Sequence, residues 1–182
     1  MPLTWLPNAL TIARCCLAAF VAWLILSEPA QSLWPLIAFI LVALTDFVDG
    51  LAARRLNAVS AFGAFLDPVA DKLLVGFSLI ALSALSGWPW ILIIPTGLII
   101  LRDVIATILR LFPKIEMPVS RLAKWKTAIE MIGISALLVA GPAQSTIIWQ
   151  SGIVIVWAAA ALSIYTLGLY LGSSLAKEER PH

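Results

Sequence analysis

The chain has 182 residues, of which 62% are hydrophobic and only 12% are charged. Because soluble domains usually carry about 25% charged residues, this composition excludes an ordinary soluble domain and indicates an integral membrane protein. The formal net charge of +2 gives no indication of nucleic-acid binding, and two adjacent cysteines exclude a disulfide framework. The one histidine is the last residue, so any chemistry must come from carboxylates, lysines, arginines, hydroxyls or bound ions.

Six apolar segments are long enough for membrane-spanning helices, which need about 20 residues each. We predict helices over residues 8–27, 33–54, 63–86, 89–111, 124–141 and 146–172. The connections between the first and second, the third and fourth, and the fifth and sixth segments contain the turn-forming sequences SEPAQS, SGWPW and AGPAQS. The prediction is therefore an all-α, six-span membrane protein, with a single domain over residues 1–182 that ends in a short polar tail at 173–182.

The basic residues predict the orientation of these helices. Lys and Arg are absent between Glu28 and Ala43, between Leu73 and Leu101, and between Thr127 and Ala176, and these stretches contain three alternate connections. The opposite side of the membrane would hold Arg54, Arg55, Arg110, Lys114, Arg121, Lys124, Lys126, Lys177 and Arg180. By the positive-inside rule, both termini and the two basic connections are expected to face the cytoplasm.

Four aspartates fall within 26 residues near the predicted cytoplasmic ends of the second and third helices. Asp46 and Asp49 are three residues apart, and Asp67 and Asp71 are four apart, so each pair shares one face of its helix. Carboxylates at membrane depth are costly and usually functional, and four together would repel one another. Oxygen-only ligands suit Mg²⁺, Mn²⁺ or Ca²⁺, and four carboxylates are enough for a two-metal site of the kind that supports phosphoryl displacement. Pro68 fits the first turn of the third helix, where proline loses no intrahelical hydrogen bond.

Each of these residues also has a simpler explanation when it is taken singly. Asp46 or Asp49 could be an interfacial charge or a helix cap. Arg54 and Arg55 alone would mark topology, and Gly63 alone would serve helix packing. The combination is what favours a functional site.

The stretch from Asp46 to Asp71 resembles the signature of the CDP-alcohol phosphatidyltransferase family, D-x2-D-G-x2-A-R-x8-G-x3-D-x3-D. Every spacer matches, and the fixed positions are Asp46, Asp49, Gly50, Ala53, Arg54, Gly63, Asp67 and Asp71. The resemblance implies an enzyme that transfers the phosphatidyl group of CDP-diacylglycerol to an alcohol and releases CMP. It also implies six helices, a homodimer surrounded by membrane lipids, and an active site on the cytoplasmic face of the inner membrane.

The resemblance implies a role for each matched residue. The four aspartates would hold two divalent cations, Mg²⁺ or Mn²⁺, and Asp71 would also be the general base that takes the acceptor's hydroxyl proton. The CDP-lipid would be bound by Asp49, Gly50, Ala53, Arg54 and Gly63.

Four segments resemble the members of the family that use sn-glycerol 3-phosphate as acceptor. They are PNALTIAR (Pro7–Arg14), FGAFLDPVADK (Phe62–Lys72), LRDVIATILR (Leu101–Arg110) and VSRLAKWKTAIEM (Val119–Met131). The expected contacts to the acceptor phosphate are Ser60, Arg102, Arg110 and Lys126. Arg102 and Arg110 are eight apart and share a helix face, and the arginine fork suits phosphate oxygens. Asp103 is expected to pair with a neighbouring arginine, whereas Arg121 and Lys124 could instead contact anionic lipid head groups.

Other functions remain open on these residues. The sequence RDV at Arg102–Val104 is similar to the cardiolipin synthases of the same family, whose acceptor is phosphatidylglycerol. Serine, inositol phosphate and amino-alcohol acceptors are also compatible with the signature. Without the resemblance, the carboxylates could be ion ligands of a small cation transporter, but a transporter usually needs polar groups near the midplane, and here the acids gather toward one face. A non-catalytic membrane scaffold would not need four carboxylates at that depth.

Overall fold

The computed structural model describes residues 5–56, 61–110 and 121–178, and the side chains of residues 12–45, 72–109 and 125–169. Within these residues the chain is all α-helical. The helices are α1 (Trp5–Ser27), α2 (Trp34–Leu56), α3 (Ala61–Leu85), α4 (Trp90–Arg110), α5 (Arg121–Ala140) and α6 (Thr146–Glu178). The helix prediction is thereby confirmed within a few residues at most boundaries.

Two boundaries differ from the sequence prediction. Helix α6 has 33 residues and continues to Glu178, through much of the predicted polar tail, because Leu175, Ala176, Lys177 and Glu178 are all good helix formers. Helix α3 begins at Ala61, so Pro68 lies beyond the first turn in which we expected it.

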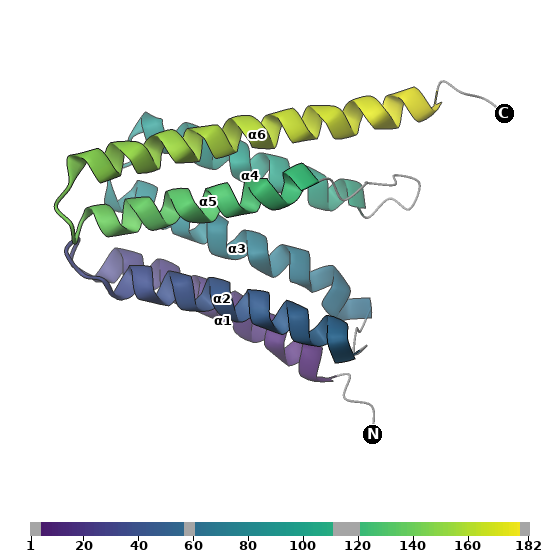
Figure 1. Cartoon of the computed structure of the whole chain (residues 1–182), viewed down its shortest axis with the longest axis horizontal. Coiled ribbons are helices and arrows are strands. Elements are labelled where there is room, and N and C mark those ends of the chain that lie inside the picture. The colour runs from purple at the N-terminus through teal and green to yellow at the C-terminus, as the bar shows by residue number, and fades with distance from the viewer. Residues whose placement is uncertain (1–4, 57–60, 111–120, 179–182) are drawn as a thin grey trace.

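The six helices run alternately up and down along one bundle (Figure 1). The beginning of α1 and the end of α6 lie at the same end as the end of α2, the beginning of α3, the end of α4 and the beginning of α5. We call this the basic end, because the helix turns there carry Arg54, Arg55, Arg110, Arg121 and Lys124, and the opposite end the far end. With six helices that alternate in direction, the described chain begins and finishes at this same end.

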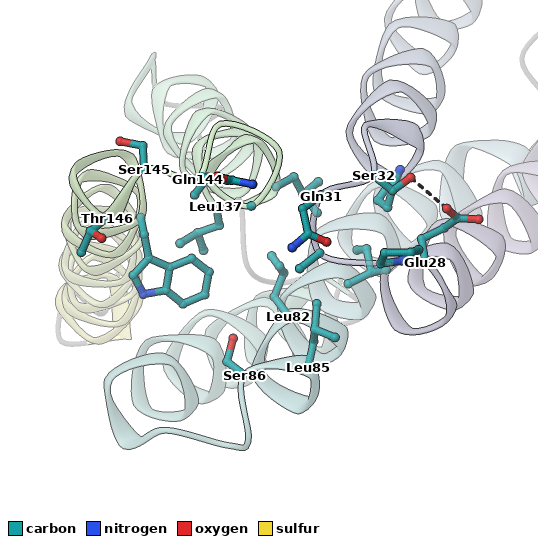
Figure 2. Close-up of a pocket in the computed structure, with 18 residues that line it drawn as sticks. Glu28, Gln31, Ser32, Leu82, Leu85, Ser86, Leu137, Gln144, Ser145 and Thr146 are labelled. Atoms are coloured by element: carbon teal, nitrogen blue, oxygen red, sulfur yellow. Dashed lines mark hydrogen bonds between the residues drawn. The ribbon is translucent and has the colours of Figure 1, made fainter.

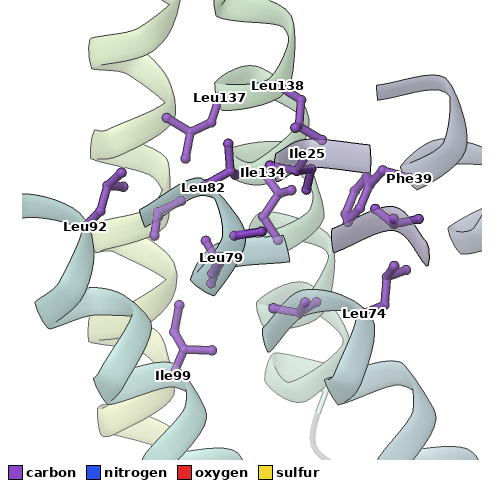
Figure 3. Close-up of a cluster of buried hydrophobic side chains, with 14 of the residues drawn as sticks. Ile25, Phe39, Leu74, Leu79, Leu82, Leu92, Ile99, Ile134, Leu137 and Leu138 are labelled. Carbon is purple, nitrogen blue, oxygen red and sulfur yellow. The ribbon is translucent and has the colours of Figure 1, made fainter. Parts of the chain in front are cut away.

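The bundle is held together by two close helix pairs, α1 with α3 and α5 with α6. Small residues let α5 and α6 approach closely: a Cβ added at Gly152 would lie 2.8 Å from the Leu137 side chain, and one at Gly133 would lie 2.9 Å from Val156. The central side chains come from all six helices and include Ile25, Phe39, Leu79, Leu92, Ile99, Ile134 and Val156 (Figure 3). This packing fixes the helices that carry the candidate site.

Large apolar side chains cover the outside of the bundle, as expected for a surface that faces lipid. Ile147 is 76% exposed, Trp90 is 75% exposed and Trp34 is 65% exposed. A soluble monomer rarely exposes so much contiguous apolar surface. Trp34, Trp88 and Trp90 stand at the far end of the bundle, where tryptophans commonly mark a membrane–water interface.

Two helices in the described parts of the chain are long and apolar enough to cross a membrane, over Trp90–Leu109 and Thr146–Leu169. Shorter apolar stretches occur at Ile12–Ser27, Trp34–Thr45 and Lys72–Leu85. Together with the exposed apolar surface, these helices indicate a membrane protein.

Candidate active site

The four aspartates lie on two antiparallel helices at matching depths. Asp46 lies ten residues before the end of α2, and Asp71 lies ten residues after the beginning of α3. A helix rises about 1.5 Å per residue, so both Cα atoms lie roughly 15 Å from their helix ends. The Cα atoms of Asp49 and Asp67 likewise lie at matching distances, roughly 10 Å from their helix ends. The backbone therefore carries all four aspartates in one layer near the basic end.

The other signature residues follow the same helices. Gly50, Ala53 and Arg54 lie in the last two turns of α2, and Gly63 lies in the first turn of α3. The side chains of all eight signature residues are outside the described part of the structure, and so are Ser60 and the side chain of Arg110. Their predicted roles stay predictions.

A buried cluster of charged side chains lies in a neighbouring layer of α4 and α5. Arg102, Asp103, Lys126 and Glu130 are all nearly inaccessible to solvent. Arg102 lies eight residues before the end of α4, and Lys126 lies five residues after the beginning of α5. At about 1.5 Å per residue, both are roughly 8–12 Å from the basic end, which is close to the depth of the aspartates.

Asp103 is the centre of this cluster. Its Oδ1 atom accepts hydrogen bonds from Arg102 Nη1 at 3.0 Å and from Lys126 Nζ at 2.6 Å. Lys126 Nζ also pairs with Glu130 Oε1 at 3.1 Å, one helical turn along α5. The expected pairing of Asp103 with a neighbouring arginine is confirmed. Among the described side chains, this cluster therefore contains two basic and two acidic residues that pair with one another.

Helix α6 supplies neutral partners to the same cluster. Arg102 Nη2 donates to Thr166 Oγ1 at 3.2 Å, and Thr166 Oγ1 donates to the Ser163 carbonyl at 2.9 Å. Ser163 Oγ donates to Glu130 Oε1 at 3.5 Å. Side chains from α4, α5 and α6 are therefore joined in one network.

Lys72 connects this network to the helix that carries the third and fourth aspartates. It follows Asp71 directly in α3, and its Nζ donates to the Asp103 carbonyl oxygen at 2.9 Å and to Thr107 Oγ1. Thr107 Oγ1 donates in turn to the same carbonyl at 2.7 Å. A cavity of about 260 Å³ opens beside these groups, with walls formed by apolar side chains such as Phe77, Ile80 and Ile100.

Sequence reasoning identified part of this arrangement. It named Arg102 and Lys126, which the structure brings together, and Asp103 as an ion-pair partner. It missed Glu130, although the spacing of four residues from Lys126 was a visible signal. It also missed Lys72, Thr107, Ser163 and Thr166, for which the sequence carries no signal that separates them from ordinary helix residues.

The far end of the bundle contains a second cavity, of about 500 Å³ (Figure 2). Its rim includes Glu28, Gln31, Ser32 and Gln144, and its floor includes Leu82 and Leu137. Ser32 Oγ donates to Glu28 Oε2 at 2.8 Å. The residues lining this cavity include no lysine or arginine, so it lacks the charge network of the basic end.

Comparison with known proteins identifies the family to which this chain belongs. The sequence profile of the CDP-alcohol phosphatidyltransferase family matches residues 4–165. The chain therefore belongs to the CDP-alcohol phosphatidyltransferase family, and it is a phosphatidyltransferase enzyme.

Three relatives of the chain have names that state their reaction. The chain is 41% identical, over 88% of its length and 90% of the relative's, to a CDP-diacylglycerol–glycerol-3-phosphate 3-phosphatidyltransferase of Rickettsia bellii (strain RML369-C). It is 38% identical, over 94% of its length and 83% of the relative's, to the protein of the same name in Cereibacter sphaeroides. A cardiolipin synthase (CMP-forming) of Oryza sativa subsp. japonica is 35% identical over 91% of this chain, but the match covers 56% of that relative.

Proposed function

We propose that the protein transfers the phosphatidyl group of CDP-diacylglycerol to sn-glycerol 3-phosphate, giving phosphatidylglycerophosphate and CMP. The observation that carries this proposal is the 41% identity to a relative of that name over nearly the whole of both chains. The K-x-K-T segment at Lys124–Thr127 supports the same acceptor. Cardiolipin synthesis is the less supported alternative, because the relative with that name matches over little more than half of its own length.

The proposed metal ligands are Asp46, Asp49, Asp67 and Asp71, which would hold two divalent cations, Mg²⁺ or Mn²⁺. Their donor chemistry fits, because carboxylate oxygens without histidine or cysteine suit hard cations. Among the described side chains, no group of three or more His, Cys, Asp or Glu residues gathers, so the signature aspartates remain the candidates. When bound, such ions supply charge neutralisation at the donor's pyrophosphate.

The chain's own residues orient the two substrates. Gly50, Ala53 and Gly63 leave room for the cytidine nucleotide, and Asp49 and Arg54 hold it. Asp71 takes the proton from the acceptor hydroxyl as that oxygen attacks the phosphorus of the CDP-lipid. Phosphoryl transfer depends on positioning and charge more than on a strong nucleophile, so no covalent intermediate with the protein is required.

The acceptor phosphate is bound by cations at the same depth. Arg102 and Lys126 lie within one buried cluster, and Arg110 is the last residue of α4 at the basic end. Ser60 would add a hydroxyl contact from the connection between α2 and α3. Six membrane crossings with the basic end toward the cytoplasm would let soluble glycerol 3-phosphate enter while the lipid tails stay in the bilayer of the inner membrane. We also propose a homodimer, as the family resemblance implies.

The test is CMP release by purified protein in mixed micelles with CDP-diacylglycerol and Mg²⁺ or Mn²⁺. Glycerol 3-phosphate, phosphatidylglycerol, serine and inositol phosphate are offered separately. We expect release with glycerol 3-phosphate alone. Release with phosphatidylglycerol instead would replace the proposed acceptor, and ion flux in sealed vesicles without CDP-lipid would favour the transporter.

A further inference from the structure

We infer that Asp103 is a positioning residue, whose carboxylate holds Arg102 and Lys126 together as one binding unit for the acceptor phosphate. This inference rests on the proposed function, because it assigns a task to Asp103 within the acceptor site. Asp103 itself is not expected to touch either substrate.

The packing of the helices shows why such a residue is needed. Within the described residues, α4 and α5 do not pack against each other: α4 packs on α3 and α6, and α5 packs on α6, α2 and α3. The hydrogen bond of 2.6 Å from Lys126 Nζ to Asp103 Oδ1 crosses between them. This hydrogen bond joins the Lys126 ammonium directly to α4, although the two helices do not pack on each other.

The shared oxygen also brings two cations closer than they would otherwise lie. Arg102 Nη1 and Lys126 Nζ both contact the same Oδ1 atom, so their charges are only a few ångströms apart in a buried layer. Two like charges in a poorly screened interior repel strongly. The Asp103 carboxylate offsets that repulsion, and a phosphate with several oxygens can then meet both groups at once.

Lys126 retains a donor for such a phosphate. An ammonium group has three N–H donors, and in the described residues two of them are directed at Asp103 and Glu130. We assign the third to the acceptor phosphate. The Asp103 carbonyl meanwhile accepts from Lys72, so the cations are held at a fixed place relative to the residue that follows Asp71.

The two acids of the cluster provide a matched comparison. Asp103 and Glu130 are both buried and both contact Lys126, but Asp103 alone also contacts Arg102. Asp103→Asn removes the charge that joins the two cations, whereas Glu130→Gln keeps an oxygen for Lys126 and leaves the Asp103 contacts intact. Glu28→Gln is the control for the loss of a carboxylate that lies outside the cluster, at the far end of the bundle.

The experiment measures kcat and the KM of each substrate for the wild type and these three variants. We expect Asp103→Asn to raise the KM for glycerol 3-phosphate about tenfold or more, since charge-assisted hydrogen bonds are lost. Glu130→Gln should raise it no more than about threefold, and Glu28→Gln should leave it unchanged. In all three variants the KM for CDP-diacylglycerol should stay within about twofold of the wild-type value. Loss of a hydrogen bond to that substrate would change its KM by more than this.

Several outcomes would overturn the inference. A lower KM for glycerol 3-phosphate in Asp103→Asn would show that the Asp103 carboxylate opposes binding of the acceptor phosphate. Equal rises of this KM in Asp103→Asn and Glu130→Gln would show that Asp103 matters no more than Glu130. A parallel rise in both KM values with a lower melting temperature would indicate a structural ion pair. A wild type that does not use glycerol 3-phosphate would refute the proposed acceptor, and the inference would fall with it.

A second variant keeps the test decisive if Asp103→Asn does not fold. Thr166→Val removes the hydroxyl that accepts from Arg102 and donates to the Ser163 carbonyl, but leaves the charge of the cluster unchanged. It should raise the KM for glycerol 3-phosphate about threefold and spare the CDP-lipid, because one hydrogen bond that orients Arg102 is lost. An unchanged KM would contradict the idea that the position of Arg102 matters.

Discussion

Two regions near the basic end carry charged residues in opposite patterns. The α2–α3 region places four aspartates at matching depths, whereas the described side chains of the α4–α6 cluster include two basic and two acidic residues that pair with one another. Acidic and basic side chains that pair can hold one another in place. Four carboxylates in one layer would repel one another if all were ionised, and we propose that they bind divalent cations. The comparison separates a region with the pattern expected of a metal site from one whose side chains pair among themselves.

The largest effect should come from neutralising one aspartate of the α2–α3 region. We expect Asp67→Asn or Asp71→Asn to lower CMP release by at least about a thousandfold, because each is a proposed metal ligand and Asp71 is also the proposed general base. The measurement is turnover with saturating substrates, on protein shown by size-exclusion chromatography to be folded in detergent. Turnover close to that of the wild type in either variant would remove the metal-site assignment.

An intermediate effect should come from Arg110, a cation of the proposed acceptor site. Arg110→Ala should raise the KM for glycerol 3-phosphate about tenfold or more, with a much smaller rise for the CDP-lipid, because a charge-assisted contact to the acceptor phosphate is lost. Arg121→Ala is the matched control, since Arg121 begins α5 at the same end and could instead contact lipid head groups. An equal rise for both substrates in Arg110→Ala would exclude Arg110 from the acceptor site.

The smallest effect on turnover should come from the far end. A Cβ at Gly141 would lie 2.0 Å from the Ala30 carbonyl oxygen, so Gly141→Ala must displace the connection between α1 and α2. We expect a destabilisation of about 1–3 kcal/mol, seen as a lower melting temperature, with kcat unchanged. Gly97→Ala is the control, because a Cβ there meets nothing within 4 Å. A large loss of kcat in Gly141→Ala would show that chemistry is not confined to the basic end.

The sequence predicted the helices well because apolar length and turn residues are local signals. The four aspartates could also be placed, since helix spacing and alternating direction fix their depth once the boundaries are known. The cluster was predicted only in part. The pairing of Lys126 with Glu130 is an i, i+4 relation that the sequence displays. The contact of Arg102 with Thr166 joins residues 64 positions apart, and only the packing of α4 on α6 creates it.

Arg102 shows the limit of reasoning from residue type. Its position favours phosphate binding, but the sequence does not reveal that its guanidinium is directed at Asp103 and Thr166 inside the bundle. A buried ion pair is costly to form, and we propose that this one is retained because it fixes the position of Arg102. The comparison of the two regions therefore depends on tertiary contacts that no local pattern records.

The most direct test of the account is a count of Mn²⁺ ions bound per chain, by electron paramagnetic resonance, in detergent with CDP-diacylglycerol present. The account predicts two bound ions in the wild type, fewer in Asp67→Asn and Asp71→Asn, and the wild-type number in Asp103→Asn. Equal Mn²⁺ binding by the wild type and Asp67→Asn, or no specific binding by either, would contradict the claim that the α2–α3 aspartates hold the metal ions.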